Sequence, residues 1–325
     1  MRWQRPINTE AEMRAFVPEP ISKVRLKILD HLERHSQRMI AMSSLAVLSS
    51  GGAISIVTTR GRVVPDGDRR VRVDDPTVSL QGGVGGLFVI PGMEETLRIN
   101  GRAAGGAIEI EEAYLQCPKA FIRSKLWDPA TWSAQPGADD TTHAALTAPM
   151  RAFIARAPFG FICTESADGH GDVSPRGDPA GAFVRVLDDT TVLLPDRTGN
   201  QLADTLRNVL SVPRATLVLC IPGESDALEL IARAQIIADD VLLLPSAVNG
   251  KPPKLGLILE LTSARFRRGA LTAVWNAGAL VDPKQLPTMG EMILDQVNPN
   301  GRLLNKVGSA IFDLGNAFHK KRRLY

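Results

Sequence analysis

The chain has 325 residues, 44% of them hydrophobic, 22% charged and 5% aromatic, with a formal net charge of +3. This composition is typical of a soluble globular protein with one large domain or two ordinary ones. The low charge and the few aromatic side chains argue against a nucleic-acid-binding protein and against a basic membrane-surface protein.

Three cysteines, Cys117, Cys163 and Cys220, are far apart and form no CxxC pair. This usage fits a reducing compartment and a chain without a disulfide framework. Cys163 and Cys220 stand in apolar runs, so we expect both in the core. We find no signal-peptide pattern and no apolar run of membrane-spanning length, and therefore expect a cytoplasmic protein.

The first 44 residues predict a leader and a helix. Residues 1–20 look irregular, and apolar residues recur at helical spacing over residues 21–44. His31 and His35 are four residues apart, a spacing that can hold zinc, but no third ligand is nearby. We therefore expect two solvated histidines.

Residues 45–115 predict β-strands broken by Gly and Pro turns, in the segments LAVLSS, AISIVTT, VRV, GGLFVI, TLRINGRA and AIEIEEAYL. A short helix-like segment follows from Cys117 to Trp127. Residues 128–148 are rich in Pro, Ala, Asp and Thr and predict a linker.

The second half centres on a predicted β-hairpin, formed by the alternating run Ala182–Leu187 and by Thr191–Leu194. A polar, glycine-bearing loop stands at each end of it, and the two loops hold Asp172, Ser174, Arg176, Asp178, Asp196, Arg197, Asn200, Asp204, Arg207 and Asn208. Arginine forks and free loop N–H groups suit a phosphate. One such loop alone is more typical of a solvated turn, but two at one hairpin favour an anion site.

The order of elements before the linker recurs after it, which indicates an internal repeat. The segment IPGMEETLRINGRA at 90–103 aligns without gaps with IPGESDALELIARA at 221–234, an offset of 221 − 90 = 131. The offset is 114 upstream, at Ile40, and 148 downstream, at Trp127. The first copy is therefore 17 residues shorter in two places, at PDRTGNQLADTLRNVL and near residues 240–255.

We divide the chain into a degenerate first copy (1–130), a linker (131–148), a second copy (149–283) and a C-terminal helical segment (284–325). The last segment has an apolar stripe that is more typical of core packing than of a cofactor site: Met289, Met292, Ile293 and Val297.

The two copies keep complementary polar residues. Only the second has DVSPRGD and PDRTGN, whereas only the first has Arg98, Asn100, Arg102, Lys119, Arg123, Ser124 and Trp127 in the equivalent later motifs. Fusion of a symmetric dimer explains this, because one of two shared sites can persist while the other decays. Random divergence would not sort the residues so cleanly. We expect the pseudo-site from Arg60 and Arg265 to Trp275 to be empty or weak.

These motifs resemble the pyridoxamine 5′-phosphate oxidase-like FMN-binding split-barrel superfamily, in particular its pyridoxamine 5′-phosphate oxidase-related branch. The motifs are DVSPRGDPAGAFVRVLDD (172–189), LLPDRTGNQLADTLRNVL (193–210), IPGMEETLRINGRA (90–103) and CPKAFIRSKLWDP (117–129). In the branch all four occur in one shorter chain, whereas here each copy keeps two. The resemblance covers about residues 21–283.

The resemblance implies a mostly β fold of two tandem FMN-binding split β-barrels, which form an intrachain pseudo-dimer with peripheral helices. It implies one composite FMN site, with Ser174, Arg176, Arg197, Asn200 and Asn208 from the second copy and Arg98, Asn100, Arg102, Lys119, Arg123, Ser124 and Trp127 from the first. Asp172, Asp178 and Asp204 are expected to orient the arginines or to cap turns rather than to contact an anion.

The resemblance also implies an FMN-dependent oxidoreductase that acts on a small molecule, with oxygen or NAD(P)H as electron partner, as a monomer or homodimer. The alternatives are a non-catalytic flavin- or haem-binding split-barrel protein and a structural barrel without ligand. The chain lacks the FMN-binding strand motif of true pyridoxamine phosphate oxidases, which argues against vitamin B6 oxidation. It has no GxSxG, no Walker A motif and no metal-ligand cluster, and no side chain stands out as a general base.

Overall fold

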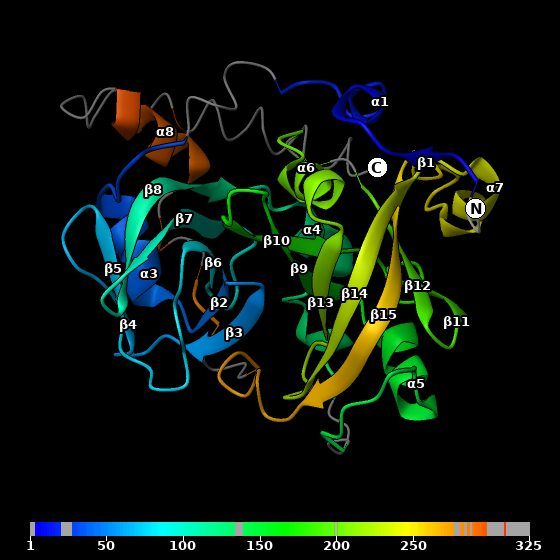
Figure 1. Cartoon of the computed structure of the whole chain (residues 1–325). Helices are drawn as coiled ribbons and strands as arrows, with labels where there is room; N and C mark the ends of the chain where they lie inside the picture. Colours follow the sequence, from blue (N-terminus) through cyan, green and yellow to red (C-terminus); the bar gives the residue numbers. More distant parts are fainter. Residues whose placement is uncertain are drawn as a thin grey trace.

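The computed structural model is a mostly β protein in which two antiparallel sheets lie side by side, with short helices around them (Figure 1). This confirms the predicted fold class, two tandem split β-barrels that form an intrachain pseudo-dimer. The structure describes residues 4–20, 28–133, 139–197, 199, 201–275, 280–282, 285–286, 288–297 and 309.

The first sheet has seven antiparallel strands in the order β3-β2-β6-β7-β8-β5-β4. They are β2 (Leu45–Ser50), β3 (Ala53–Thr58), β4 (Val63–Pro65), β5 (Arg70–Val73), β6 (Gly83–Val89), β7 (Thr96–Ala104) and β8 (Ala107–Gln116). The apolar residues that alternate along these strands, such as Leu48, Phe88 and Ile99, form one core.

The second sheet has the order β10-β9-β13-β14-β15-β12-β11. Its strands are β9 (Phe159–Glu165), β10 (Gly171–Gly177), β11 (Arg185–Asp188), β12 (Thr191–Pro195), β13 (Arg214–Cys220), β14 (Ala227–Ile237) and β15 (Gly256–Arg267). A two-residue strand, β1 (Pro6–Ile7), pairs with the C-terminal end of β14. The predicted hairpin is present as β11 and β12, but its first strand begins at Arg185 rather than at Ala182.

Both sheets follow one topology. Numbered within each half, the seven strands lie in the order 2-1-5-6-7-4-3. The sixth strands, β7 and β14, carry a register irregularity after Asn100 and after Ile231, which are 231 − 100 = 131 residues apart. This is the offset expected from the sequence repeat. The duplication itself stays a prediction.

The register of the last strands, β8 and β15, gives an offset between the copies that differs from the predicted 148. Gln116 and Arg267 end equivalent registers of β8 and β15, so the offset there is 267 − 116 = 151 rather than 148. Trp127 and Trp275 follow these residues by 127 − 116 = 11 and 275 − 267 = 8 positions. The predicted match of the two tryptophans thus requires a connection three residues shorter after β15 than after β8; their ring centroids lie 5.7 Å apart.

A nine-residue helix precedes the first strand of each seven-stranded path, α3 (Arg34–Met42) before β2 and α5 (Ala148–Arg156) before β9. The predicted helix over residues 21–44 is therefore wrong for residues 28–33, which are not helical, and residues 21–27 lie outside the described residues. Leu29 exchanges backbone hydrogen bonds of 3.0 and 2.7 Å with Ala113 of β8. The chain before α3 thus uses its backbone groups to extend a sheet, which prevents a helix there.

The other helices are short and lie around the sheets (Figure 1). They are α1 (Glu10–Arg14), α4 (Lys119–Ser124), η1 (Pro129–Thr131), α6 (Asp204–Ser211), α7 (Asp240–Leu243), η2 (Leu244–Ser246) and α8 (Met289–Val297). The helix α8 confirms part of the predicted C-terminal helical segment; of residues 298–325, all but Ser309 lie outside the described residues. None of the described helices has the length and apolar character needed to cross a membrane.

The start of the chain is not the irregular leader that its sequence predicts. Thr9 and Glu12 form a capping box at the N-terminus of α1, which satisfies two backbone N–H groups. Met13 is fully buried in the core of the second sheet, and Phe16 and Val17 pack against that core. The N-terminal segment therefore packs on the second barrel.

A third apolar core lies between the sheets and joins β2 and β6 of the first barrel to β9 and β13 of the second. Close approach of the backbones depends on Gly85 and Gly171. A Cβ on Gly85 would lie 2.5 Å from the carbonyl oxygen of Gly171, and one on Gly171 would lie 2.4 Å from that of Ser49. Any larger residue would push the barrels apart.

Candidate functional site

Strand β10 carries the motif DVSPRGD along the boundary between the barrels (Figure 1). Asp172, Ser174 and Arg176 alternate along it and share one face, and Asp178 follows directly. The strand packs against β6 and β2 of the first sheet. Side chains from both barrels can therefore meet on its polar face.

The first group on this face is the Asp172 cluster, formed by Arg98, Asp172, Ser174, Asp204 and Thr205. Arg98 of β7 forms ion pairs with Asp172 and, at 3.4 Å, with Asp204, and its Nη1 donates to Ser174 Oγ at 3.4 Å. Thr205 Oγ1 donates to Asp172 Oδ2 at 3.1 Å. Arg98 and Asp172 are each only 2% exposed. A cation of the first barrel thus pairs with a carboxylate of the second inside the protein.

Burial and the neighbouring charges together determine the electrostatics of this cluster. Burial opposes the charge of Arg98, but the neighbouring charges, Asp172 foremost, outweigh it and raise the pKa of Arg98. Burial also raises the pKa of Asp172, and the charge of Arg98 offsets part of that rise. The ring of Tyr114, whose pKa burial raises, lies 5.4 Å from the Arg98 guanidinium. The guanidinium of Arg98 therefore interacts with buried groups of the protein.

The second group, the Asp178 cluster, consists of Arg123, Asp178 and Arg197. Arg123 of α4 donates from Nε to the Gly177 carbonyl at 2.8 Å and lies 3.4 Å from Asp178 Oδ1. Arg197 pairs with Asp178 Oδ2 at 2.5 Å and donates to the Ser246 carbonyl at 2.7 Å. One buried carboxylate therefore pairs with one arginine from each barrel. Asp172, Asp178 and Asp204 all form ion pairs with arginines, and their orienting role stays a prediction.

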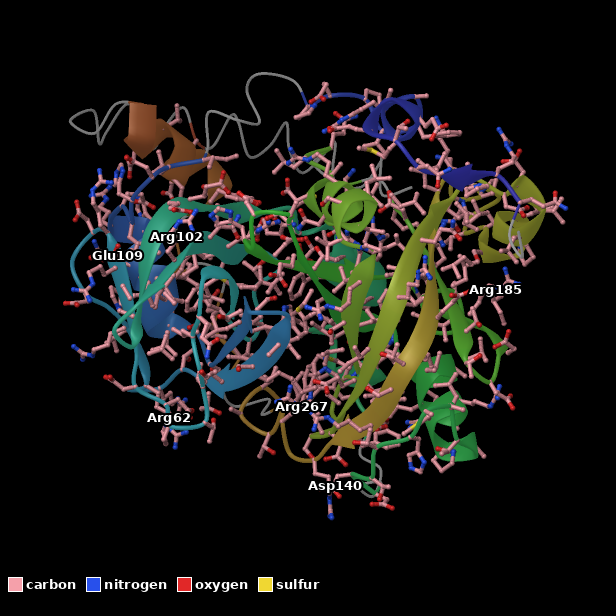
Figure 2. The ribbon with its side chains drawn as sticks, in the orientation of Figure 1. Arg62, Arg102, Glu109, Asp140, Arg185 and Arg267 are labelled. Atoms are coloured by element: carbon pink, nitrogen blue, oxygen red, sulfur yellow. The ribbon has the colours of Figure 1, made fainter. Side chains whose placement is uncertain are left out.

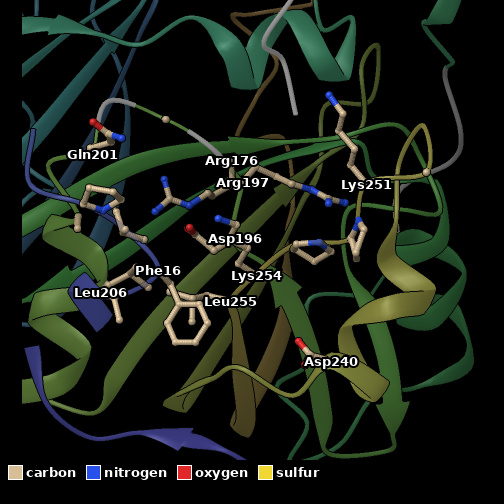
Figure 3. A pocket seen from close by; sticks show the side chains of 18 residues that line it. Phe16, Arg176, Asp196, Arg197, Gln201, Leu206, Asp240, Lys251, Lys254 and Leu255 are labelled. Atoms are coloured by element: carbon tan, nitrogen blue, oxygen red, sulfur yellow. The ribbon is translucent and has the colours of Figure 1, made fainter. Parts of the chain in front are cut away.

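A cavity of about 900 Å³ lies beside Arg176 and Arg197 (Figure 3). Its walls are the N-terminal segment 15–18, the loop 250–255 and the end of the second motif. The lining residues are Ala15, Phe16, Val17, Pro18, Arg176, Asp196, Arg197, Gly199, Gln201, Ala203, Leu206, Asp240, Gly250, Lys251, Pro252, Pro253, Lys254 and Leu255. The size is that of a small-molecule or cofactor site.

Two of the charged lining residues have ion-pair partners. Arg197 pairs with Asp178, a carboxylate that it shares with Arg123, and Asp240 pairs with Arg5 at 2.8 Å. These pairs offset part of the charge of the wall before any ligand enters.

Three cations and one carboxylate of the lining have no such ion-pair partner among the described residues. Within the described part of the chain, no carboxylate lies at ion-pair distance from Arg176, Lys251 or Lys254. Asp196 is half-buried in the wall, and burial raises the pKa of its carboxyl against the opposing charges of Arg176, Arg123 and Arg197. The wall is therefore net positive and suits an anion.

The predicted site residues fall into three sets. Arg176 and Arg197 line the cavity. Arg98, Ser174 and Arg123 lie behind it in the two clusters, where they contact the residues that line it or their partners. The first and second copies do meet here, as the composite-site hypothesis expects, although the described lining includes none of the seven residues expected from the first copy.

The remaining predicted residues have other partners. Asn208 donates to Thr164 at 3.1 Å, Asn100 to Glu112 at 2.8 Å, and Arg102 to Glu111 at 2.8 Å. In α4, Lys119 is half-buried and Ser124 donates to the Phe121 carbonyl at 3.0 Å. Trp127 donates to the Met93 carbonyl and packs against Trp275. Asn200 lies outside the described residues.

Sequence reasoning missed Lys251, Lys254 and the N-terminal wall. The signal for the lysines is the sequence KPPK inside one of the two stretches that the first copy lacks. Two prolines restrict the backbone of such a loop. Phe16 and Val17 carry no comparable signal, because they reach the cavity only through the packing of α1.

The pseudo-equivalent region of the other side has a different chemistry. Glu229 stands on β14 where Arg98 stands on β7, since 229 − 98 = 131. It is 2% exposed and pairs with Arg265 at 2.7 Å and Arg267 at 3.0 Å. Figure 2 shows Arg267 at the boundary of the barrels, where its Nη1 donates to the Ile54 carbonyl of the first barrel at 3.1 Å.

The family model of pyridoxamine 5′-phosphate oxidase matches residues 146–249. No curated protein matches the chain. Among the described residues, no group of three or more His, Cys, Asp and Glu side chains is arranged to hold a metal ion.

Among solved structures there are matches of 10–19% identity that cover 36–45% of the chain. A variant of HupZ from Group A Streptococcus is 15% identical over 37% of this chain and 98% of its own, with a TM-score of 0.32. General stress protein 26 from Bacillus anthracis is 14% identical over 36% and 94%, with a TM-score of 0.29. A protein described as F420 reductase is 16% identical over 36% and 94%, with a TM-score of 0.28.

Proposed function

The chain belongs to the pyridoxamine 5′-phosphate oxidase-like family through residues 146–249, and from this premise we propose that it binds FMN in the cavity beside Arg176. We further propose that the FMN-bound protein is an oxidoreductase that acts on a small molecule, with NAD(P)H or oxygen as electron partner.

The observation that carries the proposal is the charge of the cavity wall. Arg176, Lys251 and Lys254 supply three positive charges and Asp196 one negative charge, which leaves 3 − 1 = +2. A phosphate monoester carries about −1.5 to −2 charges at pH 7. One such group would neutralise the wall, and the forked Arg176 guanidinium suits its oxygens.

The other lining residues fit the rest of the cofactor. Phe16, Val17, Leu206 and Leu255 are apolar and would cover a planar ring system and exclude water from it. Ala203, also in the lining, precedes α6, whose N-terminus no side chain caps. The backbone N–H groups of a helix start favour an anion, which adds to the fit.

When bound, flavin supplies the electron- and hydride-transfer chemistry. The chain's own contribution is to bind, orient and shield it. Asp178 fixes Arg197 at the cavity wall, so this guanidinium keeps one orientation. The Asp196 carboxyl, whose pKa burial raises, can hold a proton on Oδ at a higher pH than an exposed aspartate. It is the one lining carboxyl without an ion-pair partner among the described residues.

Haem is the less suitable alternative for this cavity. The described lining contains no histidine, cysteine, methionine or tyrosine, which are the usual axial ligands. A flavin carrier without catalysis uses the same residues as the proposed enzyme, so only a redox test separates the two.

We also propose a cytoplasmic location. Cys163 and Cys220 are buried and free, as the sequence predicts, and Cys117 is free as well. Burial raises the pKa of Cys163 and of Cys220, which keeps both thiols protonated and unreactive. Free thiols of this kind fit a reducing compartment.

The test is the cofactor content of the purified protein. We expect a flavin absorbance spectrum, release of FMN on heat denaturation, and loss of most FMN in Arg176→Ala. The matched control is Arg185→Ala, which removes a half-buried arginine of β11 that donates to the Leu242 carbonyl at 2.6 Å. Flavin that resists Arg176→Ala, or a Soret band in place of flavin, would overturn the assignment. Bleaching by NADPH without air, followed by recovery in air, identifies an enzyme; no bleaching by NADPH or by candidate substrates identifies a carrier.

A further inference from the structure

We propose that Thr205 and Asp172 are positioning residues through which Arg98 of the first barrel holds Arg176 in the orientation that binds a phosphate group. The inference rests on the proposed function and adds a mechanism to it: the first sheet, whose strands supply none of the described lining residues, nevertheless sets the affinity of the cavity for its ligand.

The first step is the anchoring of Arg176. Its Nη2 donates to Thr205 Oγ1 at 3.1 Å, and its Nη1 donates to the Pro175 carbonyl at 3.2 Å. A hydroxyl can donate only one hydrogen bond, and Thr205 Oγ1 donates it to Asp172 Oδ2 at 3.1 Å. Thr205 therefore accepts from the arginine and donates to the aspartate, so the direction of both hydrogen bonds is fixed.

The second step is the charge balance of Asp172. Its carboxylate is almost completely buried and pairs directly with Arg98. Ser174 and Thr164 donate to the same Oδ2 at 3.4 Å. Without Arg98 the uncompensated Asp172 would draw the guanidinium of Arg176 toward itself and away from the cavity, because opposite charges attract strongly in a buried site.

The third step is the start of α6. Asp204, its first residue, lies 3.4 Å from Arg98, and Thr205 follows it in the helix. Ala203 and Leu206 line the cavity. Arg98 therefore fixes both the guanidinium and the helix end that face the same space.

The test compares FMN with riboflavin, which has the same ring and no phosphate, by fluorescence titration of the apoprotein. Thr205→Val removes the hydroxyl with little change of shape, and we expect FMN affinity to fall about tenfold. Riboflavin affinity should not change, and Thr205→Ser should restore FMN affinity. A purely structural role would lower both affinities alike.

A matched control is Thr191→Val, at a fully buried threonine of β12 whose Oγ1 has no hydrogen-bond partner among the described residues. It should leave both affinities unchanged. Arg98→Lys is a second variant that keeps the positive charge but loses the forked guanidinium. It should also lower the affinity for FMN and leave the affinity for riboflavin unchanged.

Three results would overturn the inference. If Thr205→Val binds FMN as tightly as the unmodified protein, the hydroxyl has no positioning role, and the proposed function is unaffected. Equal loss of FMN and riboflavin assigns Thr205 to folding only. An unmodified protein that binds neither flavin refutes the proposed function, and the inference falls with it.

Discussion

The two pseudo-equivalent regions of this molecule have one strand skeleton and opposite charges. On β7 the buried position holds Arg98, which reaches across the boundary to Asp172 of the other barrel. On β14 it holds Glu229, which pairs with Arg265 and Arg267 of the adjacent strand in its own sheet. The equivalent buried position thus carries opposite charges in the two regions: Arg98 forms its ion pairs across the boundary, whereas Glu229 forms its ion pairs within one sheet.

The neighbours of these positions differ in the same direction. Asp172 pairs with Thr164 in the second sheet, and Ala53 pairs with Ser50 in the first, where 164 − 50 = 114 is the local offset. The first barrel therefore has an alanine in place of the carboxylate. Residues 74–82, which join β5 to β6, contain no helix, whereas the corresponding connection of the second barrel contains α6. The carboxylate of Asp172 and the N-terminus of α6 are therefore present in the second barrel and have no equivalent at these positions of the first.

The largest effect that tests this comparison is expected for Arg98→Met. Removal of the guanidinium leaves Asp172 buried without its counter-charge, and we expect a loss of about 3–5 kcal/mol in the free energy of unfolding. The loss should shrink as the pH falls, because protonation of Asp172 removes the unpaired charge. Urea denaturation at several pH values measures both.

Arg102→Met is the control for that measurement. Arg102 lies on the same strand (Figure 2), but its ion pair with Glu111 is exposed. Such pairs contribute about 0–1 kcal/mol. Equal losses in the two variants would show that the pair across the boundary has no special weight.

The second prediction concerns the arginines that share Asp178. Arg123→Ala and Arg197→Ala should each weaken FMN binding by about 1.5–3 kcal/mol, although the arginines belong to different barrels. Flavin content after gel filtration measures this. Arg62→Ala, which removes an arginine of the first barrel paired with Asp75, should leave the content unchanged. Full FMN content in the Arg123 variant, with loss in the Arg197 variant, would contradict a site shared by both copies.

A smaller effect is expected on the other side, for Glu229→Gln. The glutamate is buried, but its partner Arg265 is 47% exposed and stays hydrated after the change. We expect a loss of about 1 kcal/mol in the free energy of unfolding and no change in flavin content. A loss as large as that of Arg98→Met would show that both regions hold the barrels together equally.

Much of this fold follows from local sequence patterns. Alternating apolar residues predict six strands of the first sheet and the hairpin β11–β12, because alternation places one face in a core. The uneven distribution of motifs between the copies predicts that Arg98 and Arg123 meet residues of the second copy, which the ion pairs with Asp172 and Asp178 bear out.

The cavity wall could not be predicted in this way. Phe16 reaches it because Met13 anchors α1 on the second barrel, a contact between residues far apart in the chain. The helix expected from residue 21 ignores the bridge between Leu29 and Ala113, which is equally remote in sequence. Periodicity reports which face of a segment is apolar but not which surface covers it, so closure of the cavity needs tertiary information.

The smallest effect is expected for a change of Asp196, a cavity residue that is not among the ion-pair partners of Glu229. Because burial raises the pKa of Asp196 in the folded protein above the ordinary value of about 3.9, the folded state binds more protons than the unfolded state in the range above that value. The stability of the unmodified protein therefore falls as the pH rises through this range. Asp196→Asn lacks this loss, so its unfolding temperature should equal that of the unmodified protein below about pH 3.9 and exceed it by about 1–2 °C at neutral pH.

Asp240→Asn is the matched control, since Asp240 lines the same cavity but is exposed and paired with Arg5. It should show no such gain at neutral pH. The asparagine at 196 should also strengthen FMN binding at neutral pH, because it removes the negative charge nearest to Arg176 and Arg197 in the wall. An Asp196→Asn variant that is less stable at neutral pH, or that binds FMN more weakly, would mean that this carboxylate organises the arginines as Asp178 does. The anion-binding wall would then depend on three aspartates instead of two.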